Sequence, residues 1–253
     1  MRIFIRPYKQ SSKSALRLAR GIGAKVFRLQ NSKYKPRDTD VIINWGNKSP
    51  APAEWSYKTV LNHPLTMTRD KLHFYKTHFD LVPPFSESYQ WAEEFLTKKG
   101  NPKIVCRSIL SGMKGAGITI VSDVKDLIES KVYMKYIKKK EEYRVHFFLG
   151  NVEFIQQKKK RKEFENPNYQ IRNHDNGFVY CHKDVTVPEE VWRIIEEFLY
   201  VTDLDFGAID IVYNKKNNKA YILEVNTAPG LSGNKTLQVY VENIKKVIDE
   251  YVY

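Results

Sequence analysis

Two apolar segments, on either side of the polar run 214–219, carry side chains that a buried strand normally avoids. Asp210 lies inside the first segment, and Glu224 and Asn226 lie two residues apart in the second. A carboxylate within a strand costs free energy unless it has a partner, and residues two apart in a strand share a face. The polar run predicts a hairpin turn. The feature therefore predicts two adjacent strands that bear oxygen ligands.

The register of this hairpin brings the three side chains together. A hairpin centred on Asn217 sets Asp210 opposite Glu224. Two carboxylates and an amide are oxygen donors of the kind that Mg²⁺ or Mn²⁺ binds. The alternative is a hairpin whose acids are capped by lysines, but ligands in register followed by Pro229-Gly230 favour the metal site, because perturbed carboxylates cluster at functional sites. The opposite face then holds the expected core residues Ile209, Ile211, Leu223 and Val225.

The net charge of +13 in 253 residues favours anionic partners, such as nucleic acid, nucleotides, acidic peptides or polyphosphorylated metabolites. A hydrophobic content of 42% is enough for a full core and argues against disorder. Cys106 and Cys181 lie in apolar stretches without metal-ligand spacing, which predicts free thiols in a reducing cytoplasm. Because no segment matches a signal peptide or a bilayer span, we expect no membrane association.

The order of elements predicts an α/β unit followed by an α+β region. The α/β unit has expected strands at 2–6, 25–29 and 40–45, with a helix at 11–22, and its sheet should be parallel. The α+β region has expected helices at 69–79 (capped by Thr68), 87–99, 123–130, 187–200 and 237–251. Its expected strands, besides the hairpin, are 103–109, 118–121, 131–137, 142–149 and 151–158.

A glycine-rich turn at 111–117 connects two of these strands, after Arg107 and with Lys71 on an earlier helix. It lacks the Gly-Lys-Ser/Thr of a P-loop and the crossover helix of a dinucleotide-binding turn. Its backbone N–H groups can still bind phosphate. Asp205-Phe206-Gly207 invites comparison with protein kinases, but no His-Arg-Asp loop precedes it. Asp210 is therefore the expected ligand.

A larger set of segments completes the pattern: 62–71, Pro83-Pro84-Phe85, 104–118, 132–137, Glu142-Tyr143-Arg144, 158–161 and 172–177. Taken in order with the ligand hairpin, this set resembles the ATP-grasp enzymes, and most closely their RimK-like carboxylate–amine ligases. The sequence departs from the family pattern at two positions. Arg107 replaces the usual phosphate-binding lysine of its strand, and keeps the charge. Lys135 replaces the usual acid of the segment that meets adenine.

The resemblance implies an ATP-grasp fold made of three parts. A short N-terminal α/β domain would occupy residues 1–65. A smaller subdomain at 66–137 and a C-terminal subdomain at 138–253, which holds the metal site, would enclose the nucleotide.

The resemblance also implies roles for particular residues. Lys71, Arg107 and Gly115 would bind the phosphates of ATP, and Asp210, Glu224 and Asn226 would bind Mg²⁺ or Mn²⁺. The backbone of Lys135, Tyr136 and Ile137 would meet adenine, and Glu142 would hold the ribose. Asn173 would contact metal or phosphate. Arg172, with Lys158, would stabilise the charge of a tetrahedral intermediate.

The activity implied is an ATP-dependent carboxylate–amine ligase that forms an amide bond through an acyl phosphate. One candidate reaction adds an amino acid to a peptide or protein. A kinase on the same scaffold that acts on an anionic small molecule is the first alternative. A nucleic-acid-binding or nucleic-acid-modifying protein is the second, and steeply salt-dependent binding would favour it. The sequence names neither the acid nor the amine.

Overall fold

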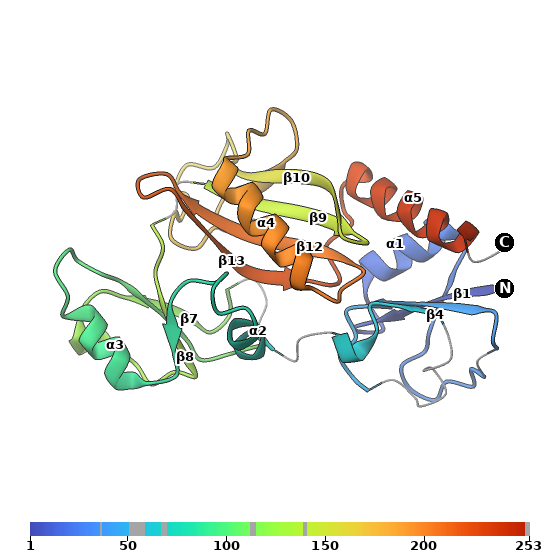
Figure 1. Ribbon diagram of the computed structural model, residues 1–253, viewed down its shortest axis with the longest axis horizontal. Helices are drawn as coiled ribbons and strands as arrows, with labels where there is room; N and C mark the ends of the chain where they lie inside the picture. Colours follow the sequence, from blue (N-terminus) through green and yellow to red (C-terminus); the bar gives the residue numbers. More distant parts are fainter. Residues whose placement is uncertain (36, 51–58, 67–69, 112–114, 139–140, 251–253) are drawn as a thin grey trace.

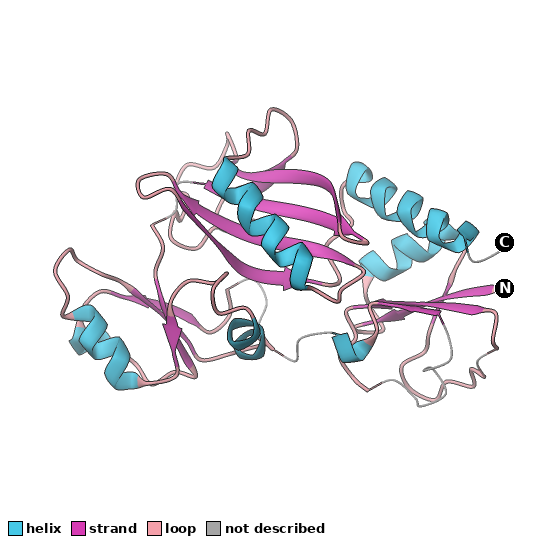
Figure 2. Ribbon diagram, viewed as in Figure 1, coloured by secondary structure: helices cyan, strands magenta, loops and turns pink. Residues whose placement is uncertain are grey.

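The computed structural model describes residues 1–35, 37–50, 59–66, 70–111, 115–138 and 141–250. These residues form three sheets, with helices packed against each of them (Figures 1 and 2). One sheet is parallel and two are antiparallel, as the predicted combination of α/β and α+β parts requires. In the described ranges, no helix has the length and apolar character needed to cross a membrane.

The N-terminal sheet is parallel, as predicted. Its strand order is β2 (Lys25–Val26), β1 (Arg2–Pro7), β3 (Asp40–Trp45) and β4 (Thr59–Leu61). Helix α1 (Lys13–Ile22) begins after Ser12, whose hydroxyl accepts the Ala15 N–H, and ends at Gly23 in the left-handed conformation. The second strand is shorter than the expected 25–29, and β4 was not predicted.

Helix α5 (Asn234–Glu250) closes the chain and packs beside α1 (Figure 1). Ile244 and Val247 of α5 share one core with Ala15 and Leu18 of α1. The two helices approach closely at Gly21, where an added Cβ would lie 2.5 Å from Cγ2 of Val241. The C-terminal helix therefore packs with the N-terminal unit, and it also contacts the C-terminal sheet through Tyr240, whose hydroxyl donates to the Gly207 carbonyl at 2.8 Å.

The middle sheet is antiparallel, with the order β5 (Phe85–Ser86), β8 (Val132–Lys135), β6 (Ile104–Arg107) and β7 (Ile118–Val121). Helix α3 (Tyr89–Leu96) packs on it through Ala92 and Leu96. The helix expected at 123–130 is wrong: only a 3₁₀ turn forms, at Val124–Asp126, because Leu127 is already extended. Part of the glycine-rich turn, 112–114, lies outside the described residues.

The C-terminal sheet is antiparallel and is covered on one face by α4 (Glu189–Val201) (Figure 1). Ile194 and Phe198 of α4 pack with Val145, Phe147 and Ile209 of the sheet. Strand β11 was not predicted, because its sequence follows a long basic and polar connection. The strand order is β11 (Phe178–Cys181), β10 (Asn151–Lys160), β9 (Glu141–Phe148), β12 (Phe206–Asn214) and β13 (Lys219–Asn226).

The register of the β12–β13 hairpin matches the prediction at its functional end. Asp210 pairs with Glu224, but the register shifts by one immediately afterwards, so that Ile211 pairs with Ile222. Leu223 is the extra residue of this β-bulge. The expectation that Leu223 faces the core is therefore wrong: Ile222 is fully buried there, and Leu223 lines a cavity on the other face.

Helix α2 (Lys71–Thr77) stands between the middle and C-terminal sheets (Figure 1). Its N-cap is Asp70, whose side chain accepts the His73 N–H, whereas the expected cap Thr68 lies outside the described residues. A 3₁₀ turn at Pro64–Thr66 precedes it. Phe74 of α2 packs against Phe198 of α4, so that the helix is anchored by the core of the C-terminal sheet.

Candidate nucleotide and metal site

A cavity of about 1100 Å³ lies between the middle sheet, the C-terminal sheet, α2 and the carboxyl ends of β1 and β3. Its volume lies just above the usual range for ligand-binding pockets, about 300–1,000 Å³. Every residue that the sequence suggested for the site lines it, although the residues come from many different elements; their individual roles stay predictions. These residues are Lys71, Arg107, Gly115, Lys135, Tyr136, Ile137, Glu142, Lys158, Arg172, Asn173, Asp210, Glu224 and Asn226.

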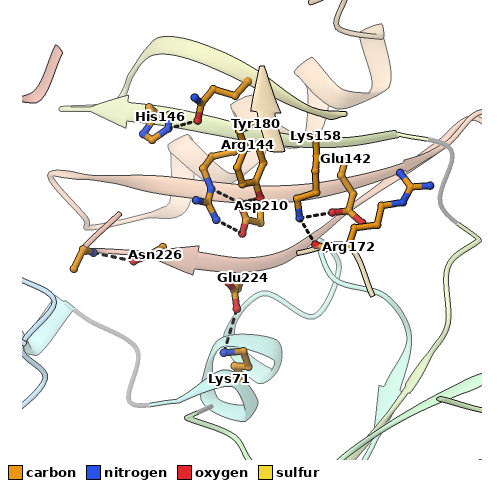
Figure 3. A network of polar contacts seen from close by, with 12 residues as sticks. Lys71, Glu142, Arg144, His146, Lys158, Arg172, Tyr180, Asp210, Glu224 and Asn226 are labelled. Carbon is orange, nitrogen blue, oxygen red and sulfur yellow. Dashed lines mark hydrogen bonds and ion pairs between the residues drawn. The ribbon is translucent and has the colours of Figure 1, made fainter. Parts of the chain in front are cut away.

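Asp210 is bound on both oxygens by Arg144, its register partner on β9. Arg144 Nε donates to Oδ1 and Nη2 donates to Oδ2, each at 2.7 Å, and the Tyr180 hydroxyl donates to Oδ1 at 3.2 Å (Figure 3). Burial raises the pKa of Asp210, but the Arg144 and Lys158 charges lower it by more, so the carboxylate stays ionised. A bidentate guanidinium–carboxylate pair is among the strongest polar contacts in proteins.

Glu224, the second predicted carboxylate ligand, is paired with a different cation from Asp210. Its Oε2 lies 3.1 Å from Nζ of Lys71, which reaches over from α2 (Figure 3). Lys48, which follows β3, lies near this pair: burial and then the Lys71 charge lower its pKa. Asn226, the third predicted ligand, accepts the Ala228 N–H on Oδ1 at 3.0 Å. The two carboxylates thus reach the cavity from adjacent strands, and each is neutralised by its own cation.

A third ion pair joins Glu142 and Lys158, on β9 and β10. Lys158 Nζ lies 2.5 Å from Glu142 Oε2 and donates to the carbonyl of Arg172 at 2.9 Å (Figure 3). Glu142 is buried, with 4% of its surface exposed. Lys158 also lies 4.9 Å from the ring centre of Tyr180. The lysine therefore links the strand to the loop that carries Arg172.

The loop at 161–177 holds Arg172 against aromatic rings. The guanidinium lies 5.3 Å from the ring centre of Phe178 and 5.9 Å from that of Tyr169, within cation–π range. Nearby, a Cβ added at Gly115 would lie 3.2 Å from Ile171. Gly115 and the 161–177 loop therefore lie close together at the cavity.

The segment expected to meet adenine begins at Lys135, the last residue of β8. The Lys135 amide donates to the Pro84 carbonyl at 2.8 Å, and the Tyr136 amide donates to the Lys103 carbonyl at 2.9 Å. These two amides hold the segment against the rest of the middle sheet. Ile137, the third residue, is buried and lines the cavity.

Among the cavity residues that were not chosen from the sequence, three carry polar groups at the centre of the site. Arg144 and Tyr180 bind Asp210, as described. The Tyr75 hydroxyl is fully buried and has no hydrogen-bond partner among the described residues, and burial raises its pKa to about 12. Buried polar groups are normally satisfied by protein, water or ligand. Only Arg144 had a sequence signal, in the acid-x-Arg element after the adenine segment.

His146 is a buried residue of the cavity wall and belongs to a polar network. Its Nδ1 is 3.2 Å from the Tyr240 hydroxyl and its Nε2 is 3.0 Å from Gln156 Oε1. The ring stacks on Phe154, with centroids 4.4 Å apart. Burial lowers the pKa of His146 to about 4, so that it is neutral near pH 7.

The donor set fits a divalent cation of the Mg²⁺ type. In the described part of the chain, no three His, Cys, Asp or Glu side chains gather as a metal cluster, so a cation here would rely on two carboxylates and the Asn226 amide. That all-oxygen set is the kind that Mg²⁺ and Mn²⁺ prefer. Asp205, by contrast, accepts the Asn62 N–H and supports the connection before β12.

Comparison with known proteins places the fold. No protein-family profile and no curated protein sequence matches the chain. Among solved structures, D-alanine–D-alanine ligase from Bacillus anthracis superposes with a TM-score of 0.65 over 99% of both chains, at 17% identity. The chain has the ATP-grasp fold. The predicted fold class is thereby confirmed.

Two further solved structures with the ATP-grasp fold were obtained with bound ligands. The ATP-grasp ligase PsnB, in complex with minimal precursor, Mg and ADP, gives a TM-score of 0.68 at 12% identity, over 99% of this chain and 97% of that one. A RiPP-associated ATP-grasp ligase from Chryseobacterium gregarium, in complex with ADP and a leader and core peptide, gives 0.63 at 15% identity over 97% of both chains.

Proposed function

We propose that this protein is an ATP-dependent carboxylate–amine ligase. The observation that carries the proposal is the cavity in which all the predicted nucleotide and metal residues meet. The ATP-grasp fold supports it, because the similar solved structures are ligases. In the proposed reaction, a substrate carboxylate takes the γ-phosphoryl group and releases ADP, and an amine then displaces phosphate and loses a proton.

The chain's own cations suit the phosphates of ATP. Among the described residues that line the cavity, positively charged side chains outnumber negatively charged ones. The negative side chains are Asp70, Glu142, Asp210 and Glu224. Lys71 and Arg107 would hold the phosphates, with backbone N–H groups near Gly115. A divalent cation on Asp210, Glu224 and Asn226 would offset charge during phosphoryl transfer. The positive side chains are Lys48, Lys71, Arg107, Lys135, Arg144, Lys158 and Arg172.

Adenine would bind at the other end of the cavity. Because the Lys135 and Tyr136 amides are used within the middle sheet, the base would bond to the Ile137 backbone or to carbonyls of this segment. Glu142 would hold the ribose, and binding there would compete with its pairing to Lys158. Arg172, with Lys158, would then face the tetrahedral intermediate, with Asn173 at the metal or phosphate.

A peptide or protein is the proposed class of one substrate. Two of the similar ligases were solved in complex with precursor or leader peptides, and the excess positive charge favours an acidic partner. The RimK-like activity, in which an amino acid is added to a peptide or protein, fits this class. We further propose that the chain divides into three domains, with boundaries after residues 65 and 137. We also propose that the protein is cytoplasmic.

The test is ATP turnover by the purified protein with Mg²⁺. Phosphate release should require both a carboxylate and an amine, supplied as amino acids and acidic peptides, and mass spectrometry should detect the amide. D210A and E224A should abolish it, and D203A, which changes an exposed acid near β12, should not. Phosphorylation of a hydroxyl without an amine would instead identify the kinase. If the protein forms no ATP-dependent product but binds RNA or DNA with a steep salt dependence, the nucleic-acid alternative is favoured.

A further inference from the structure

The ion pair between Arg144 and Asp210 uses the carboxylate that the proposed metal site needs. Both oxygens of Asp210 accept a guanidinium N–H at 2.7 Å, and Oδ1 also accepts the Tyr180 hydroxyl. We propose that Arg144 is a further residue of the site, which holds Asp210 until a divalent cation displaces it. This inference rests on the function proposed above, because it takes Asp210 as a metal ligand.

The two cations compete for the same lone pairs. A divalent cation binds a carboxylate through the oxygen atoms that Arg144 now occupies. Arginine remains charged at every accessible pH, so it cannot yield the site by losing a proton. Two cations at one largely buried carboxylate repel each other strongly, and Asp210 has only 9% of its surface exposed. A divalent cation that enters alone must therefore break the bidentate pair.

Once displaced, the Arg144 guanidinium has a new place to bind. It already stacks over the Tyr180 ring at 4.3 Å from the ring centre. Its side chain lines the same cavity that would hold the phosphates. An anionic oxygen there would replace the lost carboxylate. Nucleotide and metal should therefore strengthen each other's binding, and by equal factors, since such coupling is reciprocal.

The Lys71–Glu224 pair provides an internal comparison. It has a single contact of 3.1 Å, and the Glu224 side chain is 38% exposed, against 12% for Asp210. Water screens the exposed pair more strongly, so Lys71 should oppose the metal less than Arg144 does. Removing Arg144 should therefore raise the affinity for the metal more than removing Lys71.

The experiment measures Mn²⁺ binding in the absence of nucleotide, by the paramagnetic resonance signal of free Mn²⁺, at pH 8. R144Q should bind Mn²⁺ about tenfold more tightly than the parent protein, within the range of coupling found between sites. K71Q should gain less, and D210N combined with R144Q should lose the gain. R193Q removes one positive charge on α4, where Arg193 pairs with Glu190 and Glu197, and should match the parent.

Equal Mn²⁺ affinity in the parent and R144Q, or an equal gain in R193Q, would overturn the inference. Circular dichroism checks that R144Q is folded. If it is not, R144K serves instead: it keeps the charge but loses the bidentate geometry, and should show a smaller gain, whereas no gain would count against the idea. The proposed function fails separately, if the parent binds no ATP in the presence of Mn²⁺, whatever R144Q does.

Discussion

Lys71 on α2 reaches across the cavity to Glu224 on β13, with Nζ 3.1 Å from Oε2. This contact joins the helix before the middle sheet to the hairpin of the C-terminal sheet. Both side chains are partly exposed, at 18% and 38%, so their pairing contributes at most about 1 kcal/mol to stability. Lys71 should therefore contribute mainly to ligand binding rather than to the stability of the fold.

We expect K71Q to melt within a few degrees of the parent without ligand, but to lose most of the stabilisation that ATP and Mg²⁺ provide, because ligand binding to the native state raises the midpoint. A thermal-shift titration measures both quantities. The control is K76Q on the same helix, whose lysine pairs with Glu87 at the surface. A K71Q protein that responds to ATP and Mg²⁺ as K76Q does would contradict the assignment.

The Arg144–Asp210 pair should contribute to stability in a different way. R144M leaves Asp210 as an unpaired, largely buried charge, which costs about 3 kcal/mol or more. Replacing both partners in R144M/D210L removes the buried charge, and should recover much of the loss. Urea unfolding of the parent and three variants measures the cycle. A double variant that is less stable than R144M would show that the loss of stability comes from losing the ion pair rather than from leaving Asp210 unpaired.

The sequence predicted the ligand hairpin because its register follows from the chain alone. Asp210 and Glu224 pair as the turn position requires, and its apolar run identified β12. The bulge at Leu223 was not predictable from the local pattern, and beside it the Ile222 amide donates to the Leu81 carbonyl at 2.7 Å. That bond joins segments far apart in sequence.

The partners of the site residues were missed for a similar reason. Arg144 contacts Asp210 because β9 and β12 are neighbours in the sheet, although 66 residues separate them in the chain. Tyr180 lies on β11, a short edge strand that follows a long connection. Local patterns indicate which residues carry chemistry, but the order of strands in the sheet decides which cation neutralises which acid.

Acid should destabilise the protein through His146. Its buried ring has a pKa of about 4 in the folded protein, against an ordinary value of 6.5. Between these values the unfolded chain binds the extra proton, so stability rises with pH in this window and is lost as pH falls from about 6.5 to 4. The full loss from this residue is on the order of 3 kcal/mol.

Urea unfolding at pH 7 and pH 4.5 measures the effect. H146Q lacks the titrating ring, so its stability should fall less between the two values than that of the parent. H182Q, which changes an exposed histidine beside β11, should keep the parent's pH dependence. Parallel profiles for the parent and H146Q would show that other groups govern the acid response.

The contact between α1 and α5 should reverse the usual effect of a helical Gly→Ala change. Alanine at position 21 gains about 1 kcal/mol of helix propensity, but its Cβ would lie 2.5 Å from Val241 Cγ2, and overpacking costs about 1–3 kcal/mol. G21A should therefore destabilise the parent. In a V241A background the clash is absent, and the same change should stabilise. Urea unfolding of the parent, G21A, V241A and the double variant measures how G21A changes the free energy of unfolding in each background. A change of the same sign in both backgrounds would rule out the close approach.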